Sequence, residues 1–224
     1  MGLDMYLNRM PRHKGATADD VSRVENFLYW LQAKFDGSEH AKCGFEEWCG
    51  CEKIPSQDDL EFYANYYKAI YSDWDKEKQH PWWRIKEEVG YWRKANQIHN
   101  WFVENIQGGI DDCNYHREVR EEDLRELLDI CQRVLDSCEL VDGQICNGYT
   151  YEDGKRIPIM EDGKYVKDPS VAEELLPSAS GFFFGSTDYD EYYIDDIKNT
   201  IDIITKVLET TDFDTQMIYY CSSW

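Results

Sequence analysis

One stretch of the chain, GYWRKANQIHNWFVENI, gathers basic, amide and aromatic side chains within an otherwise acidic sequence. Arg93 and Lys94 could bind phosphate or carboxylate oxygens, because both side chains carry a positive charge on hydrogen-bond donors. Asn96 and Asn100 could contact the polar edge of a planar ligand, since a carboxamide both donates and accepts hydrogen bonds. Trp101 could stack on the same ligand. Together these residue types predict a binding site for a small anionic, nucleotide-like molecule.

The same stretch predicts a helix that contains His99. The helix is expected to run from Tyr91 to Gln107 and to end at the pair Gly108-Gly109. Its inner face would hold Trp92, Ala95, His99, Phe102, Val103 and Ile106. His99 could be a core histidine that makes one hydrogen bond, or a general base or ligand donor at the floor of a pocket. The residue pattern leaves both roles open.

The polar side chains of this helix are expected on two different sides. At 100° per residue, Arg93, Asn96 and Asn100 line one margin of the apolar face. Lys94 and Trp101 lie together on the far side. One pocket within a single chain is therefore not expected to use both groups. Either one group is structural, as a solvated helix margin with salt bridges would be, or the site is built between the chains of a homo-oligomer.

A second candidate segment follows a predicted strand over residues 178–186. Ser186 and Thr187 stand at the predicted junction of that strand with a helix, where free backbone N–H groups bind anions. The spacing and the lysine of a Walker phosphate loop are missing. Asp188 and Asp190 would compete with an anion, and Asp188 could simply cap the helix. Anion binding and helix capping therefore stay as alternatives for this segment.

Four residues in a predicted irregular insertion over residues 38–55 could ligate zinc: His40, Cys43, Cys49 and Cys51. Their spacing, H-x2-C-x5-C-x-C, is not that of a standard zinc finger or ribbon. The chain also lacks a nucleophile elbow, an HExxH motif and a carboxylate pair to which a mechanism can be assigned. The sequence therefore predicts no metal, no cofactor and no catalytic residue, and it favours a non-catalytic protein.

Charge and hydropathy restrict the classes of partner. With 24 basic and 45 acidic residues, the net charge of −21 argues against direct nucleic-acid binding, which needs a basic face. The same charge suits a soluble protein whose acidic surface meets a basic partner. The first residues, MGLDMYLNRM, lack the pattern of a secretory signal, and no stretch approaches eighteen apolar residues. We therefore expect a cytosolic protein with reduced thiols and no membrane segment.

Strands and helices are interspersed without a regular βαβ alternation, which favours an α+β fold over a doubly wound one. The expected fold is a single domain over residues 1–224, with a mainly antiparallel sheet that includes the N- and C-terminal strands and with helices packed largely on one face. Asn-Gly and Asp-Gly turn signals predict a β-hairpin excursion over residues 142–167. Further strands are expected at 2–9, 111–119 and 213–221, and helices at 17–35, from about residue 56, at 121–138, at 168–176 and after residue 188.

Four strings of the sequence are similar to a family of uncharacterised proteins carried by bacteriophages and prophages. They are MGLDMYL, GYWRKANQIHNWF, the DDC at Asp111–Cys113 and SGFFFGSTDYDEYY. The resemblance covers the first residues and most of the chain from about Glu88 onward. It implies a viral protein that acts in the host cytoplasm, and it implies no particular mechanism.

Three functions fit that setting. The leading hypothesis is a non-catalytic binding protein that sequesters a nucleotide-like host immune signal and so counters host defence. The second is an acidic inhibitor that imitates nucleic acid and blocks a basic host defence nuclease, as the charge of −21 would allow. The third is a nucleotide-processing enzyme in which His99 is the base and the neighbouring cations hold the substrate.

Overall fold

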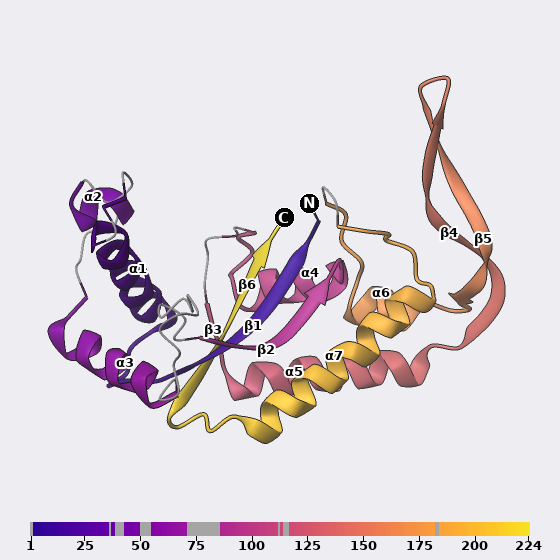
Figure 1. Ribbon diagram of the computed structural model, residues 1–224. Helices are drawn as coiled ribbons and strands as arrows, with labels where there is room; N and C mark the ends of the chain where they lie inside the picture. Colours follow the sequence, from indigo (N-terminus) through magenta and orange to yellow (C-terminus); the bar gives the residue numbers. More distant parts are fainter. Residues whose placement is uncertain are drawn as a thin grey trace. The chain divides into compact units, whose positions relative to one another are not determined.

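The computed structural model describes residues 2–35, 37–38, 43–49, 55–70, 86–111, 113, 117–181 and 184–224 (Figure 1). The fold is α+β, as the sequence predicts, with a four-stranded antiparallel sheet and a separate two-stranded hairpin. The sheet comprises β1 (Asp4–Pro11), β2 (Glu87–Arg93), β3 (Arg117–Val119) and β6 (Gln216–Ser223). Its strand order is β2-β1-β6-β3, so the first and last strands of the chain are neighbours in the middle of the sheet.

Residue contacts divide the chain into two compact units. The larger unit comprises Met1–Asn8, Glu88–Thr211 and Ile218–Trp224, and the smaller one Arg9–Glu87 and Asp212–Met217. Neither unit is continuous in sequence. The single domain predicted over residues 1–224 stays a prediction.

The larger unit packs two helices on one face of its strands. Its helices are α4 (Asn96–Asn105), α5 (Glu121–Ser137), α6 (Ser170–Leu175) and α7 (Glu191–Thr210). On β2, Trp92 donates from Nε1 to Thr200 Oγ1 of α7 at 2.9 Å, and its ring centroid lies 6.0 Å from that of Phe102 on α4. A Cβ atom at Gly90 would lie 2.6 Å from Ile203 Cγ2, so glycine is what lets α7 approach the strand.

Helix α5 confirms the clearest helical pattern of the sequence. Its buried apolar side chains are Leu124, Leu127, Cys131 and Val134, and this stripe packs against α7. The backbone N–H of Arg120 donates to Asp123 Oδ2 at 2.9 Å, which satisfies a donor at the start of the helix. Three acidic residues in the first turn also complement the helix dipole.

The predicted hairpin is present. Its strands are β4 (Leu140–Glu152) and β5 (Lys155–Val166), which pair antiparallel. Asp153 and Gly154 form the turn with φ angles of 49° and 75°, the left-handed geometry that a two-residue hairpin turn needs. The base is attached to the loop before α7, because Val166 N–H donates to the Tyr189 carbonyl at 2.9 Å.

The smaller unit contains helices α1 (Ala18–Phe35), α2 (Phe45–Cys49) and α3 (Gln57–Ile70). Thr17 N–H donates to Asp20 Oδ2 at 2.8 Å and Asp20 N–H to Thr17 Oγ1 at 3.3 Å, which confirms the helix start predicted there. Trp30 packs on Phe45 and donates from Nε1 to the Cys43 carbonyl at 3.3 Å. Five residues of the segment predicted to be irregular thus form α2.

Three secondary-structure predictions are wrong in whole or in part. The segment from Tyr91 to Arg93 belongs to β2, and α4 begins only at Asn96. Buried and exposed residues alternate at the end of β2, as they do in a strand. The prediction extended the helical spacing of the following residues back over this short alternation. The strand predicted over residues 178–186 is irregular wherever the structure describes it. Of the strand predicted over residues 111–119, only Arg117–Val119 is a strand among the described residues.

Candidate functional site

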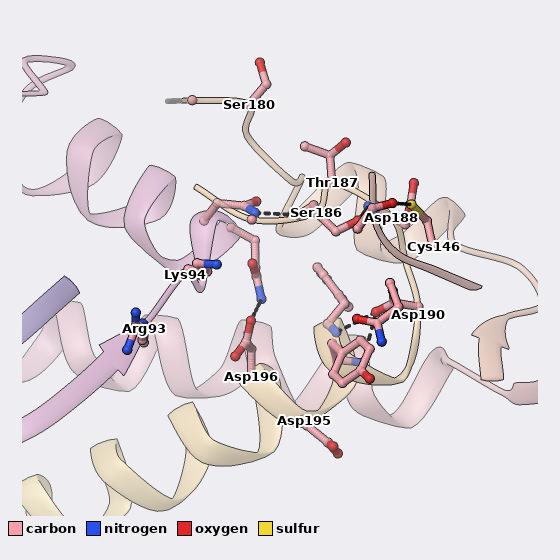
Figure 2. A pocket seen from close by; sticks show the side chains of 18 of the residues that line it. Arg93, Lys94, Cys146, Ser180, Ser186, Thr187, Asp188, Asp190, Asp195 and Asp196 are labelled. Atoms are coloured by element: carbon pink, nitrogen blue, oxygen red, sulfur yellow. Dashed lines mark hydrogen bonds between the residues drawn. The ribbon is translucent and has the colours of Figure 1, made fainter. Parts of the chain in front are cut away.

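A cavity of about 850 Å³ lies in the larger unit (Figure 2). Its wall is built from the end of β2, the start of α4, the middle of β4, the loop before α7 and the first turns of α7. This volume falls within the range of sites that bind small molecules. The wall includes five of the eight predicted ligand residues: Arg93, Lys94, Asn96, Ser186 and Thr187.

The end of β2 brings the two basic residues to one cavity. Arg93 is the last residue of the strand and Lys94 follows it in the left-handed region, with φ of 63°. Figure 2 shows both at the same side of the cavity. The expectation that they lie on opposite sides of a helix is wrong, because the chain changes from strand to helix at this point. Gly185, with φ of 95°, lies close to Lys94. A Cβ atom added at Gly185 would lie 3.3 Å from the Cβ of Lys94.

Asn96 holds the loop that faces the two cations. Its Nδ2 donates to the carbonyls of Phe184 at 3.2 Å and Ser186 at 2.7 Å. Its Oδ1 accepts the N–H of Ala179 at 2.9 Å, and the side chain is buried. The amide is therefore occupied by protein groups, and its role is to position the loop that carries Ser186 and Thr187.

Ser186 and Thr187 are exposed on the cavity wall, in the loop that precedes α7. Ser186 Oγ accepts the N–H of Asp188 at 3.1 Å, and α7 begins at residue 191. The N-cap is Asp190, whose Oδ1 accepts the N–H groups of Tyr192 at 2.9 Å and Tyr193 at 3.1 Å. Capping by Asp188 is thus wrong, and the free N–H groups predicted for anion binding are already used by Asp190.

Four carboxylates also line the cavity: Asp188, Asp190, Asp195 and Asp196. Asp196 Oδ2 accepts a hydrogen bond from Gln97 Nε2 at 3.2 Å, and burial raises the pKa of Asp196 to about 6. Burial also raises the pKa of Asp190, although the two backbone N–H groups act in the opposite direction. The cavity is therefore basic at one side and acidic at the other (Figure 2).

Asp190 has one carboxylate oxygen without a partner. The side chain is 2 % exposed, and its Oδ2 is buried with no hydrogen bond from any residue that the structure describes. Unpaired buried carboxylate oxygens are unfavourable and are expected where a ligand or water supplies the donor. The sequence analysis treated Asp188 and Asp190 as competitors of an anion, with Asp188 as a possible cap, and did not single out Asp195 and Asp196. Their position just after Ser186 and Thr187 could have marked these acids as part of the site.

His99 lies outside the cavity lining, in a closed polar cluster. Its Nδ1 is 2.7 Å from Tyr220 Oη and its Nε2 is 3.1 Å from Asp111 Oδ1. Trp224 Nε1 donates to the same Asp111 oxygen at 3.0 Å. The ring is 1 % exposed, and burial lowers its pKa although Asp111 acts in the opposite direction. Both ring nitrogens are used by protein groups, so neither is open to a substrate in this arrangement.

The remaining two candidates do not reach the cavity either. Trp101 is 5 % exposed and packs edge-on against Phe102, with ring centroids 5.3 Å apart. Asn100 is half-buried and is not part of the cavity wall. The aromatic rings that do line the cavity are Tyr149, Tyr192 and Tyr193, which the sequence analysis did not select. Tyr149 and Tyr192 are exposed enough to stack on a ligand.

No family model, curated protein or solved structure matches this chain. Among the described residues, no helix has the length and apolar character needed to cross a bilayer. The same residues contain no group of three or more His, Cys, Asp or Glu side chains placed to hold a metal ion. His40 and Cys51 of the predicted thiol-rich segment lie outside the described residues.

Proposed function

We propose that this protein is a non-catalytic binding protein that holds a nucleotide-like ligand in the cavity of its larger unit. The observation that carries the proposal is the convergence of Arg93 and Lys94 with the hydroxyls of Ser186 and Thr187 on one cavity. In the phage setting that the sequence resemblance implies, the ligand is a host immune signal that the protein sequesters in the host cytoplasm.

The chemistry of the wall suits an anionic group on the ligand. Arg93 can donate two parallel hydrogen bonds to a phosphate, and Lys94 adds a second positive charge. Ser186 and Thr187 offer hydroxyl donors on the loop that Asn96 fixes. The loop is thus held in position before a ligand arrives, which reduces the ordering entropy that binding would cost.

A binding role without catalysis is favoured by the groups in the wall. Within the described residues, the lining contains no histidine, and the Cys146 thiol donates to the Gly148 carbonyl at 3.2 Å. His99, the base of the enzymatic alternative, is hydrogen-bonded at both nitrogens elsewhere in the unit. The ligand is accordingly expected to be released chemically unchanged.

The test is calorimetric titration of the protein with cyclic nucleotides and ADP-ribose-type nucleotides. We expect at least one ligand to bind and the double variant Arg93→Ala/Lys94→Ala to weaken it by about tenfold or more, since each lost charged contact contributes about 1.5–3 kcal/mol. The matched control is Arg133→Ala/Lys206→Ala, which removes two positive charges outside the cavity wall. Absence of binding across the panel, or equal weakening by both double variants, would overturn the proposal.

Protein binding is a second candidate, favoured by the hairpin. Exposed apolar side chains line its strands, among them Tyr151 (73 %), Met160 (50 %) and Ile159 (48 %). A two-stranded hairpin is marginally stable alone, and exposed apolar patches are typical of contact surfaces. The charge of −21 selects a basic partner, such as a host nuclease that the acidic surface would block as a nucleic-acid mimic.

The matching experiment measures inhibition of a basic host nuclease by the protein. We expect inhibition to weaken at high salt, and to be lost in Tyr151→Ser/Met160→Ser, which lie on one face of the hairpin, but kept in Thr150→Ala on the other face. Inhibition that is insensitive to salt and to the hairpin variant would eliminate this candidate.

A further inference from the structure

The charges of the cavity do not match a ligand that is anionic throughout. Two cations, Arg93 and Lys94, face four carboxylates in the same wall. Among the described residues, neither cation forms an ion pair with one of those carboxylates. A ligand that fills the cavity must therefore present a negative group to one side and hydrogen-bond donors to the other.

The acidic side lacks donors at two positions, the N-cap of α7 and Asp196 within the helix. Asp190 is 2 % exposed, and its Oδ2 has no hydrogen-bond partner among the described residues. Asp196 accepts one long hydrogen bond, from Gln97 Nε2 at 3.2 Å, and Gln97 is itself buried in the cavity wall. Because ionised carboxylates only accept hydrogen bonds, both residues require donors that the protein does not provide in full.

We propose that the ligand is a guanine nucleotide or a molecule that carries guanine, with its phosphate at Arg93 and Lys94 and its N–H edge at the two carboxylate oxygens of Asp196. This inference rests on the proposed function, because it specifies the ligand of the same cavity. Guanine presents the ring N1–H and the 2-amino group side by side, so it offers two adjacent donors to carboxylate oxygens. Adenine presents its amino group beside an acceptor nitrogen, which would repel a carboxylate oxygen. Tyr149 and Tyr192 supply rings in the wall on which the base can stack.

The experiment compares the 5′-monophosphates of guanosine, inosine and adenosine, titrated into the full-length protein by calorimetry. Inosine differs from guanosine only by lacking the 2-amino group, so it isolates one donor. We expect guanosine monophosphate to bind about tenfold more tightly than inosine monophosphate, and adenosine monophosphate to bind more weakly still, because a lost hydrogen bond to a charged group changes affinity by at least that factor.

One variant tests whether the Asp196 carboxylate contacts the base. Asp196→Asn replaces one acceptor oxygen by a donor amide, which pairs with adenine in two hydrogen bonds, so the preference for guanosine should fall by about tenfold and adenosine should gain. The control is Asp202→Asn, an exposed position of α7 outside the cavity wall, which should leave all three affinities unchanged.

The outcomes separate this inference from the proposed function. Equal affinities for the three nucleotides, together with weakening in Arg93→Ala/Lys94→Ala, would overturn the guanine assignment and leave the nucleotide site standing. An unchanged base preference in Asp196→Asn, with circular dichroism showing a folded variant, would also overturn it. If neither these nucleotides nor the wider panel binds at all, the proposed function itself fails.

Discussion

The larger unit contains two buried polar clusters that differ in how completely their hydrogen bonds are satisfied. In the His99 cluster, both imidazole nitrogens have partners, and Asp111 also accepts a bond from Trp224. In the cavity, Asp190 Oδ2 has no partner among the described residues, and Asp196 has one long hydrogen bond. Phe184 adjoins both regions: its ring lies edge-on to that of His99, and its carbonyl accepts from Asn96.

The difference shows which cluster supports the fold and which one is suited to a ligand. Buried polar groups are stable only when they are paired, so a satisfied network can fix the packing of the helices and strands that supply it. A carboxylate that is left unpaired weakens the folded state unless another molecule supplies the missing donor. On this criterion the histidine, the most obvious chemical group of the sequence, is structural, and the acids of α7 are the stronger functional candidates.

The largest expected effect is the loss of stability in His99→Ala. The variant removes two hydrogen bonds, leaves Tyr220 Oη without its partner and creates a void, so we expect the free energy of unfolding to fall by about 4 kcal/mol. Urea denaturation measures it, with Gln132→Ala on the exposed face of α5 as the control. A loss below about 1 kcal/mol would mean that the cluster does not support the fold.

Asp196→Asn should change stability in the opposite direction. Burial raises the pKa of Asp196 from 3.8 to about 6, so the folded state binds this proton more tightly than the unfolded state does. The wild-type free energy of unfolding should therefore fall as pH rises between about 4 and 6, by at most about 3 kcal/mol. The variant should lack this fall and be the more stable protein near pH 7. Urea denaturation over this pH range measures the free energy of unfolding of both proteins. The same pH dependence in both would contradict the raised pKa of Asp196.

Asn96→Ala tests whether part of the cavity wall is as well satisfied as the His99 cluster. It removes three hydrogen bonds with the loop, two donated by Asn96 to the Phe184 and Ser186 carbonyls and one accepted from the Ala179 N–H, and should cost about 2 kcal/mol of stability. Because the loop is then no longer held, hydrogen exchange of its amides should become faster. Asn96→Asp keeps only the acceptor to Ala179 and sets a buried carboxylate against the Phe184 and Ser186 carbonyls, so it should cost at least as much. Unchanged exchange in Asn96→Ala would show that the loop is held by other contacts.

The smallest stability effect is expected for Arg93→Ala/Lys94→Ala. Both side chains are exposed and neither forms an ion pair with a described residue, so the free energy of unfolding should change by less than about 0.5 kcal/mol. Thermal and urea denaturation check this value before the binding experiments are interpreted. A larger loss of unfolding free energy would show that Arg93 and Lys94 stabilise the fold. The cavity would then not differ from the His99 cluster in this respect.

Local sequence signals predicted the elements whose hydrogen bonds and apolar faces are set by nearby residues. Thr17 and Asp20 satisfy each other's backbone N–H groups, and the stripe of α5 repeats at the helical period. Asp153-Gly154 supplies the left-handed turn of the hairpin. The candidate site was predicted in part, because Arg93 and Lys94 were selected for charge alone, without regard to where the backbone would place them.

By itself, the sequence determined the α+β class, the hairpin, the start of α1 and the face of α5, since short-range periodicity and turn geometry decide each of these. Only the tertiary structure decided that β2 replaces the first turn of the expected helix, where Lys94 N–H donates to the Leu3 carbonyl at 2.8 Å. That bond joins residues far apart in the chain, and pairing of this kind leaves no local signature. The same long-range packing encloses His99, buries Trp101 and brings Asp190 and Asp196 of α7 to the cavity that Arg93 and Lys94 line.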